Sequence, residues 1–331
     1  MMAVISTQHI SLDAAAAALR SGQLVVFPTE TVYGLGALAG DDRAVARLYD
    51  AKQRPQVNPL ISHFATAEAA CAAGISSPIA DSLAAAFWPG PLTLILARHS
   101  QSPTCLLATA GMDNLAVRVP SHPLARHLIE AVGGPLVAPS ANMSGKLSPT
   151  CATHISAELA AKCAFILDGG RCSEGLESTV IDCREERAVI VRPGPITPAL
   201  IRAKTGLEIG FSEAPAAIDS AFISPGLMTS HYAPDATVRL NATAPRNDEL
   251  FIGFGAPPDG VTPDLSLSPT GDLTEACALL FSLLHDADSR ARHIAIAPIP
   301  MADLGIAIIL WHFIAGLLRQ IGVNRRCYQP I

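Results

Sequence analysis

The segment at residues 25–64 constrains the fold of this chain more than any other. It begins with an apolar, β-branched run that stops at Pro28, as is typical of a buried strand. A polar Thr29-Glu30-Thr31 segment and a Gly-rich turn follow, and then a helix to about residue 51 with Asp41 or Asp42 as its N-cap. A second predicted strand, at residues 59–64, contains His63. This order predicts an α/β fold with side chains gathered at the carboxyl end of a sheet.

Two interpretations of this segment remain open at this point. A Gly-rich turn with free backbone N–H groups, close to Lys52 and Arg54, would suit an anionic ligand. The same pattern is also ordinary α/β architecture, in which basic residues at a helix end complement the helix dipole. The segment contains no GxxxxGK[ST] loop, and Gly34-Leu35-Gly36 lacks the third glycine of a dinucleotide-binding fingerprint.

Length and composition favour a globular protein of two domains. The chain has 331 residues, of which 50% are hydrophobic and 16% are charged, so it can bury a sizeable core. The net charge of −6 argues against a broad nucleic-acid-binding surface, which is normally basic, although a local cationic pocket is compatible with it.

The eight cysteines form no CxxC pair, and the N-terminal residues lack the basic and apolar regions of a signal peptide. We therefore expect a reducing, cytoplasmic location.

The remaining pattern predicts an open, twisted, mixed sheet covered by helices, followed by a linker and a smaller α/β domain. The predicted domain limits are residues 1–210, 211–236 and 237–331. In the first domain we expect helices at 11–20, 66–73, 78–87 and 123–132, a turn into a buried strand over 88–96, strands at 115–119 and 136–138, and a hairpin of 178–183 with 188–192. In the last domain we expect strands at 237–240, 250–254 and 294–297 and a helix at 273–285.

An apolar segment at residues 305–318 is shorter than the roughly 20 residues that a membrane span requires. It is expected to form a buried helix or an oligomer contact, and no membrane association is predicted.

Two features of the first domain suggest an anion site. Arg118 stands alone in an apolar strand, so it needs an anionic ligand, a carboxylate partner or an exit to solvent. The loop at residues 139–145 is rich in hydroxyl and amide groups, which suit either a hydrogen-bonded turn or the binding of phosphate oxygens.

Five motifs resemble the YrdC-like family, specifically its two-domain threonylcarbamoyl-AMP synthases. They are PTETVYGLG, KQRPQVNPLISHF, APSANMSGKLSPT, STVIDC and VRPGPIT, in the family's order over about residues 10–210. The later SPGLMTSHYAP resembles the linker of the two-domain form, except that Thr229 stands where a tyrosine is often found.

The resemblance implies an enzyme that joins L-threonine, bicarbonate or CO2 and ATP into threonylcarbamoyl-AMP and pyrophosphate. The product would pass to a separate transferase that modifies adenosine 37 of certain tRNAs, and weak binding of tRNA by this chain is left open. Mg²⁺ is expected to accompany ATP and to be held largely by the phosphates.

The resemblance also implies roles for individual residues. Lys52 and Arg54 match the family's triphosphate-binding, catalytic pair. The further ATP contacts would be Asn58, Asn114, Ser140, Asn142, Ser148, Arg192 and His231. The threonine contacts would be Thr31, His63, Arg118, Ser178 and the backbone of Ala138. Taken singly, each Ser, Thr or Asn would more often serve local turn bonding.

Three further expectations are hypotheses. His63 is assigned to threonine binding without a role in proton transfer, since a lone histidine at a strand end is more often structural. Glu30 could act as a base for the threonine amine. The linker is expected to lie over the nucleotide site as a lid that excludes water.

Two other functions share part of this sequence pattern. A YrdC-like module that binds double-stranded RNA or tRNA without forming the adenylate is disfavoured by the acidic net charge. A carbamoyl-adenylate-forming domain of hydrogenase-maturation type would carry zinc-finger-like cysteine motifs, which are absent from this sequence. Dependence on threonine rather than carbamoyl phosphate would separate the two enzymes.

Overall fold

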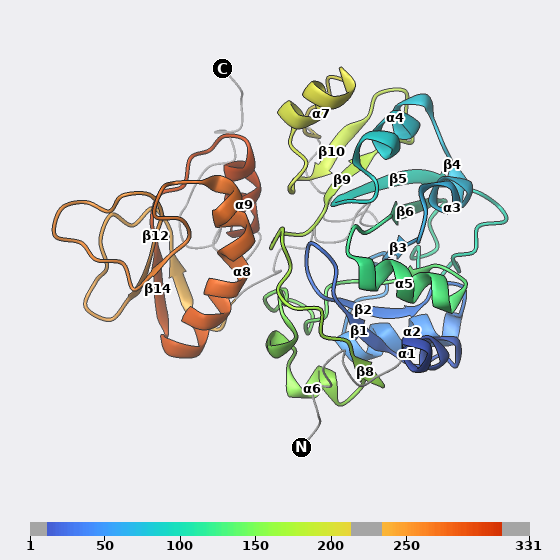
Figure 1. The fold of residues 1–331 in the computed structure, drawn as a ribbon, viewed down its shortest axis with the longest axis horizontal. Helices are drawn as coiled ribbons and strands as arrows, with labels where there is room; N and C mark the ends of the chain where they lie inside the picture. Colours follow the sequence, from blue (N-terminus) through green and yellow to red (C-terminus); the bar gives the residue numbers. More distant parts are fainter. Residues whose placement is uncertain (1–11, 213–233, 313–331) are drawn as a thin grey trace.

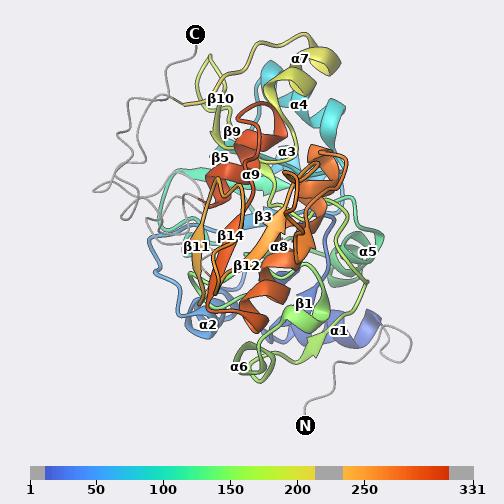
Figure 2. The ribbon, with the colours of Figure 1, turned by 90° about the vertical axis from the view of Figure 1, so that its left-hand side faces the viewer.

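The computed structural model describes residues 12–212 and 234–312. Figures 1 and 2 show a larger domain built on one mixed sheet and a smaller domain beside it. The larger sheet has the order β10-β9-β5-β6-β3-β7-β2-β1-β8, with β4 paired to β5, and the smaller has the order β11-β14-β12-β13. The predicted fold class is therefore confirmed.

The strands of the larger domain are β1 (Val25–Phe27), β2 (Gly34–Leu38), β3 (Ile61–His63), β4 (Gly74–Ile75), β5 (Leu92–Arg98), β6 (Asn114–Arg118), β7 (Leu136–Val137), β8 (Phe165–Ile166), β9 (Thr179–Asp182) and β10 (Val189–Arg192). Its helices are α1 (Leu12–Arg20), α2 (Asp42–Lys52), α3 (Ala67–Ala72), α4 (Pro78–Phe87), α5 (Pro123–Val132), a 3-10 turn at Ala152–His154, α6 (Ala157–Ala160) and α7 (Pro198–Thr205). The smaller domain contains β11 (Thr237–Arg239), β12 (Leu250–Gly253), β13 (Leu265–Ser266), α8 (Leu273–Arg290), β14 (His293–Ile296) and α9 (Leu304–His312).

Local capping explains where several helices begin. The Asp41 carboxylate accepts hydrogen bonds from the backbone N–H groups of Arg43 and Ala44 at the start of α2. Thr66 and Ser77 cap α3 and α4 in the same way. The helix predicted at 41–51 is therefore confirmed.

The Gly-rich turn predicted after Thr31 is wrong, because Gly34–Leu38 forms strand β2. This strand pairs antiparallel with β1, and the N–H of Leu35 donates to the carbonyl of Pro139 at 2.8 Å. A Cβ on Gly36 would lie only 2.8 Å from the Phe27 ring, so this glycine permits close packing between two strands. The free N–H groups expected here for an anion are used by the sheet.

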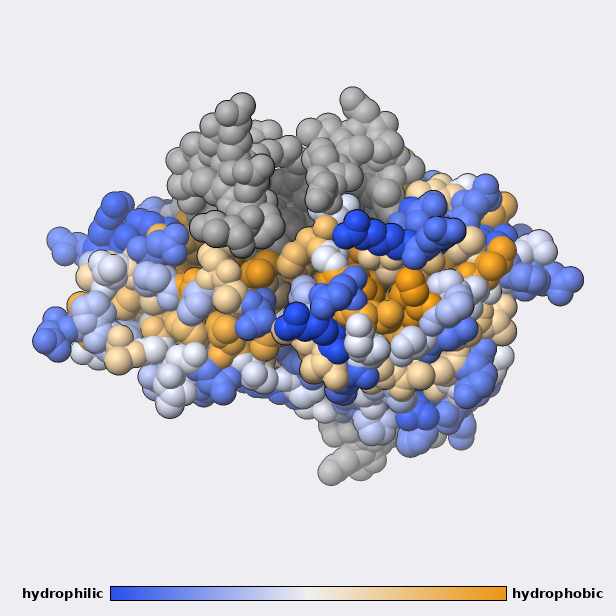
Figure 3. Space-filling view, turned by 90° about the horizontal axis from the view of Figure 1, so that it is seen from above, coloured by the Kyte–Doolittle hydropathy of each residue, from blue (hydrophilic) through white to orange (hydrophobic). Residues whose placement is uncertain are grey.

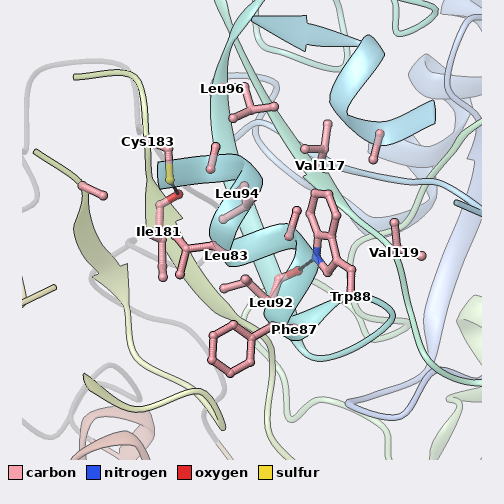
Figure 4. Packing of buried hydrophobic residues seen from close by; sticks show 14 of the residues in the cluster. Leu83, Phe87, Trp88, Leu92, Leu94, Leu96, Val117, Val119, Ile181 and Cys183 are labelled. Carbon is pink, nitrogen blue, oxygen red and sulfur yellow. Dashed lines mark hydrogen bonds between the residues drawn. The ribbon is translucent and has the colours of Figure 1, made fainter. Parts of the chain in front are cut away.

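Side chains on the central strands point alternately to two faces of the sheet, one packed against helices and one that carries polar residues. On β6, Leu115 and Val117, together with Val119 just beyond the strand, pack into a cluster with helices α3, α4 and α7. Figure 4 shows this cluster around Trp88, whose indole N–H donates to the carbonyl of Leu92 at 2.7 Å. Because successive side chains of a strand point to opposite faces, Arg118 lies on the other face of the sheet.

The smaller domain packs its helices against one face of its sheet. In α8 the buried residues include Leu280, Phe281 and Leu284, which share a cluster with Ile252 and Ile294 of the sheet. The described part of the apolar segment, in α9, joins the same cluster through Ala307 and Ile308. This part is therefore a buried helix, one of the two alternatives predicted for the segment, whereas residues 313–318 lie outside the described residues.

Helices α8 and α9 lie between the smaller sheet and the larger domain (Figure 1). The two domains approach closely at Gly175, where a Cβ would lie 2.4 Å from the carbonyl oxygen of Ala278 in α8. Gly175 also has a φ of +66°, a conformation that other residues rarely adopt. A glycine is therefore required at this contact for two independent reasons.

The predicted linker falls mostly outside the described residues, as do His231 and residues 313–331. Its lid role and the predicted domain limits stay predictions.

In the described parts of the chain, no helix combines the length and apolar character needed to cross a membrane. On the face shown in Figure 3, hydrophilic residues project at both ends of the long axis, and exposed hydrophobic residues are found nearer the middle.

Candidate functional site

The polar face of the larger sheet carries three functional side chains in one row. His63 of β3 pairs in register with Arg118 of β6, and Arg118 pairs with Thr93 of β5. Neighbours in register point to the same face of a sheet. The strands therefore place these three side chains beside one another, with the helix-covered core behind them.

Two members of this row, His63 and Arg118, line a pocket that contains most of the predicted site, whereas Thr93 lies outside its lining. The residues predicted for threonine and ATP that line it are Thr31, Arg54, His63, Arg118, Ala138, Ser140, Ser178 and Arg192. Thr31 and Arg54 follow β1 and α2, and His63 and Arg118 end β3 and β6. Ala138 and Ser140 follow β7, Ser178 directly precedes β9, and Arg192 ends β10. Three arginines thus converge on one pocket from separate parts of the chain.

Arg118 is held by Glu30. Its Nη2 donates to the Glu30 Oε1 at 2.7 Å, and both side chains are only 5% exposed. The second carboxylate oxygen of Glu30 accepts a hydrogen bond from the Ser121 N–H at 3.0 Å. Because both oxygens are engaged, Glu30 acts here by orienting Arg118, and its role as a base stays a hypothesis.

Arg192 is held by Glu177 and Ser178. Its Nη1 donates to the Glu177 Oε2 at 2.8 Å, while its Nη2 donates to the carbonyl and the hydroxyl of Ser178, each at 2.9 Å. The other oxygen of Glu177 accepts from the hydroxyl of Ser148 at 3.0 Å. Ser148, predicted as an ATP contact, is therefore joined to the pocket through Glu177.

Two residues of the site were missed by the sequence reasoning, Glu177, which lines the pocket, and Thr93, which lies beside it on β5. Glu177 directly precedes the STVIDC motif, and its need for a cationic partner could have been inferred once that segment was predicted to be buried. Thr93 hydrogen-bonds the Ser178 hydroxyl at 2.7 Å. A polar residue inside the run LTLIL was a detectable signal, because it marks the strand face that is not packed on helices.

Arg54 lines the pocket, whereas the predicted partner Lys52 is buried and lies outside its lining. The buried Lys52 ammonium donates to the carbonyl of Ser140 at 2.5 Å and to the carbonyl of Asn142. Arg54 donates from Nε to the Asn58 carbonyl at 3.2 Å and from Nη2 to the Pro59 carbonyl at 3.0 Å. These contacts place Asn58 and Asn142 next to the pocket, although their side chains do not line it.

Burial, followed by the charge of the nearby Arg54, lowers the pKa of Lys52 to about 7. Burial, followed by the charge of Arg118, lowers the pKa of His63 to about 3. The His63 ring is therefore neutral at physiological pH, and its Nδ1 lies 3.1 Å from the Ile61 carbonyl. This supports a binding role for His63 and gives no reason to assign it proton transfer.

Asn114 is the predicted ATP contact that the described structure places away from the pocket. It begins β6, whereas Arg118 ends it, so the two lie about 13 Å apart at the usual rise of a strand. The Asn114 amide contacts the sulfur of Met112. His231 cannot be placed, because it lies outside the described residues.

Within residues 12–212 and 234–312, no three His, Cys, Asp or Glu side chains are grouped as metal ligands. Both oxygens of Glu177 are engaged by Ser148 and Arg192. The Mg²⁺ expected to accompany ATP stays a prediction.

Comparison with known proteins agrees with this geometry. Residues 17–194 match a family described as telomere recombination, Sua5/YciO/YrdC, and residues 196–309 match the threonylcarbamoyl-AMP synthase C-terminal domain. A threonylcarbamoyl-AMP synthase of Bacillus subtilis is 43% identical over 254 residues, which are 75% of this chain and 71% of that protein. One from Pyrococcus abyssi is 46% identical over 226 residues, which are 68% of this chain and 66% of that protein.

The fold is also similar to a solved structure. The crystal structure of P. abyssi Sua5 complexed with L-threonine superposes with a TM-score of 0.83 at 35% identity, covering 96% of this chain and 98% of that one. Since the family match spans more than half of the sequence, the chain belongs to the Sua5/YrdC family and carries that family's threonylcarbamoyl-AMP synthase C-terminal domain.

Proposed function

We propose that this protein is an L-threonylcarbamoyladenylate synthase, a nucleotidyltransferase that condenses L-threonine, bicarbonate or CO2 and ATP into threonylcarbamoyl-AMP and pyrophosphate. The convergence of Arg54, Arg118 and Arg192 with small hydroxyl donors in one pocket is the observation that carries the proposal. The threonine held by the related P. abyssi protein supports it.

The reaction joins two anions. The threonine amine loses a proton and bonds to CO2, which gives a carbamate. A carbamate oxygen then forms a bond to the α-phosphorus of ATP while the bond from that phosphorus to the bridging oxygen of pyrophosphate breaks. Catalysis consists mainly of charge neutralisation and in-line positioning, so no nucleophile from the protein is required.

The row His63, Arg118 and Thr93 suits the threonine half of the reaction. Arg118, already oriented by Glu30, would pair with the amino-acid carboxylate. Thr31, Ser178 and the backbone of Ala138 would fix the remaining groups of threonine at the same end of the pocket.

Lys52, Arg54 and Arg192 suit the nucleotide half. A guanidinium grips phosphate oxygens in a bidentate manner, whereas the ammonium acts as a point charge. The Ser140–Asn142 loop is fastened by Lys52 and would add neutral donors. Mg²⁺, carried on the phosphates, would supply further charge neutralisation when bound. We further propose that the product passes to a separate tRNA-modifying transferase in the cytoplasm.

Incubation with ATP, Mg²⁺, bicarbonate and L-threonine, followed by mass detection of the adenylate, tests the proposal. We expect threonylcarbamoyl-AMP and pyrophosphate in equal amounts, and no adenylate when threonine is omitted. Adenylate formed from carbamoyl phosphate without threonine would contradict the proposal, as would salt-sensitive tRNA binding with no release of pyrophosphate.

Binding of ATP at pH 8 is expected to be accompanied by uptake of up to one proton per site. The pKa of Lys52 is lowered to about 7, so its amine is mostly neutral at this pH, and an approaching triphosphate raises the pKa again. Calorimetry in two buffers of different ionisation enthalpy measures this uptake.

Lys52→Met should abolish the proton uptake, whereas Lys204→Met, at an exposed site on α7, should keep it. Equal uptake in both variants would exclude Lys52 as its source.

A further inference from the structure

Helix α8 of the smaller domain contacts Ser148, which is joined to the pocket through Glu177. The ring of His285 on α8 lies with its Nε2 3.1 Å from the carbonyl oxygen of Ser148. Because a carbonyl can only accept, His285 must carry its proton on Nε2 and donate it to Ser148. The contact joins two domains across 137 residues of sequence.

Ser148 is thereby held at two points. Its carbonyl accepts from His285, and its hydroxyl donates to Glu177, which holds Arg192. A continuous chain of hydrogen bonds runs from α8 through Ser148 and Glu177 to the guanidinium that lines the pocket.

Contacts of His154 also fix the backbone around Ser148. The ring of His154 stacks on that of His285 with a centroid distance of 4.0 Å and an interplanar angle of 23°. The Nδ1 of His154 accepts from the N–H of Thr150, two residues after Ser148, at 3.3 Å. One histidine from each domain thus holds the backbone around Ser148.

Apolar packing prevents this segment from shifting as a whole. Leu147 and Leu176, which directly precede Ser148 and Glu177, are both buried in the core cluster of the smaller domain beside Leu280 and Leu284. Glu177 itself lines the pocket, so this packing anchors a residue of the pocket wall.

We propose that His285 is a positioning residue for the nucleotide half of the site, acting through Ser148 and Glu177 on Arg192. The smaller domain therefore contributes to binding of ATP without touching it. This inference rests on the proposed function, because it assumes that the pocket takes ATP at the Arg192 side.

The test compares substitutions at His285 in the full chain. His285→Leu retains bulk but loses the donor, and it should raise KM for ATP about five-fold, the loss expected from one hydrogen bond. KM for threonine should change less than two-fold. His285→Gln places an amide donor near the position of Nε2 and should restore most of the ATP affinity.

Ser282→Ala is the matched control. Ser282 lies one turn earlier on α8 and accepts a hydrogen bond from Arg171 of the larger domain, so this variant also removes one contact between the domains. It should leave both KM values unchanged. Should His285→Leu fail to fold, His285→Asn, whose amide is too short to reach Ser148, takes its place.

The inference is overturned if His285→Leu leaves KM for ATP unchanged, raises the two KM values equally, or is matched by Ser282→Ala. Failure of the unsubstituted protein to form adenylate would instead contradict the proposed function, so the two failures are distinguishable.

Discussion

Replacement of Arg54 by alanine is expected to lower kcat/KM for ATP by about 10²–10³-fold, the range found when one donor is removed from a charge-stabilising site. Arg54 lines the pocket, and backbone carbonyls of Asn58 and Pro59 fix its guanidinium. A phosphate that bears developing charge would lose a bidentate partner in this variant. Initial rates of pyrophosphate release at varied ATP concentrations measure the effect.

Two variants make this result specific. Arg54→Lys keeps the positive charge but loses the planar guanidinium that donates two parallel hydrogen bonds. Its activity should therefore fall between those of the alanine variant and the unsubstituted protein. Arg126→Ala removes a half-buried arginine of α5 that also donates to one backbone carbonyl, and it should leave kcat/KM unchanged. An Arg54→Ala enzyme with full activity would mean that the triphosphate binds elsewhere.

Replacement of Arg118 by glutamine is expected to lower kcat/KM for threonine by about 10²–10³-fold, since it removes the cation proposed to pair with the substrate carboxylate. It should also lower the free energy of unfolding by about 3–5 kcal/mol, because the buried Glu30 carboxyl would lose its cationic partner. Steady-state kinetics and chemical denaturation measure the two effects separately.

The double variant Glu30→Gln/Arg118→Gln separates binding from stability. Both members of the buried pair are then neutral, so most of the lost stability should return. The low activity toward threonine should persist. If activity returned together with stability, Arg118 would be a structural residue only.

Much of the fold was accessible from sequence because the pattern of apolar residues is strong. The apolar run around Arg118 and the cap at Asp41 correctly indicated a strand and a helix. The strand β2 was mistaken for a turn because Gly34 and Gly36 are typical of turns. Their actual role, close packing against Phe27 and Ala138, depends on contacts that are distant in sequence.

The sequence was enough to predict which residues form the site, but not how their side chains contact one another. Motif resemblance selected Arg54, Arg118 and Arg192, which the fold brings together. The carboxylates that orient two of them, Glu30 and Glu177, were not assigned to that task, since an ion pair is defined by tertiary structure. The contact of His285 with Ser148 was not predicted for the same reason, since it too is defined by tertiary structure.

The central claim is that one pocket holds threonine and the triphosphate within reach of each other. A crystal structure with L-threonine and a non-hydrolysable ATP analogue tests it most directly. We expect the threonine carboxylate on Arg118 and the phosphates beside Lys52, Arg54 and Arg192. Phosphates bound on another surface, or threonine away from the row of His63, Arg118 and Thr93, would contradict it.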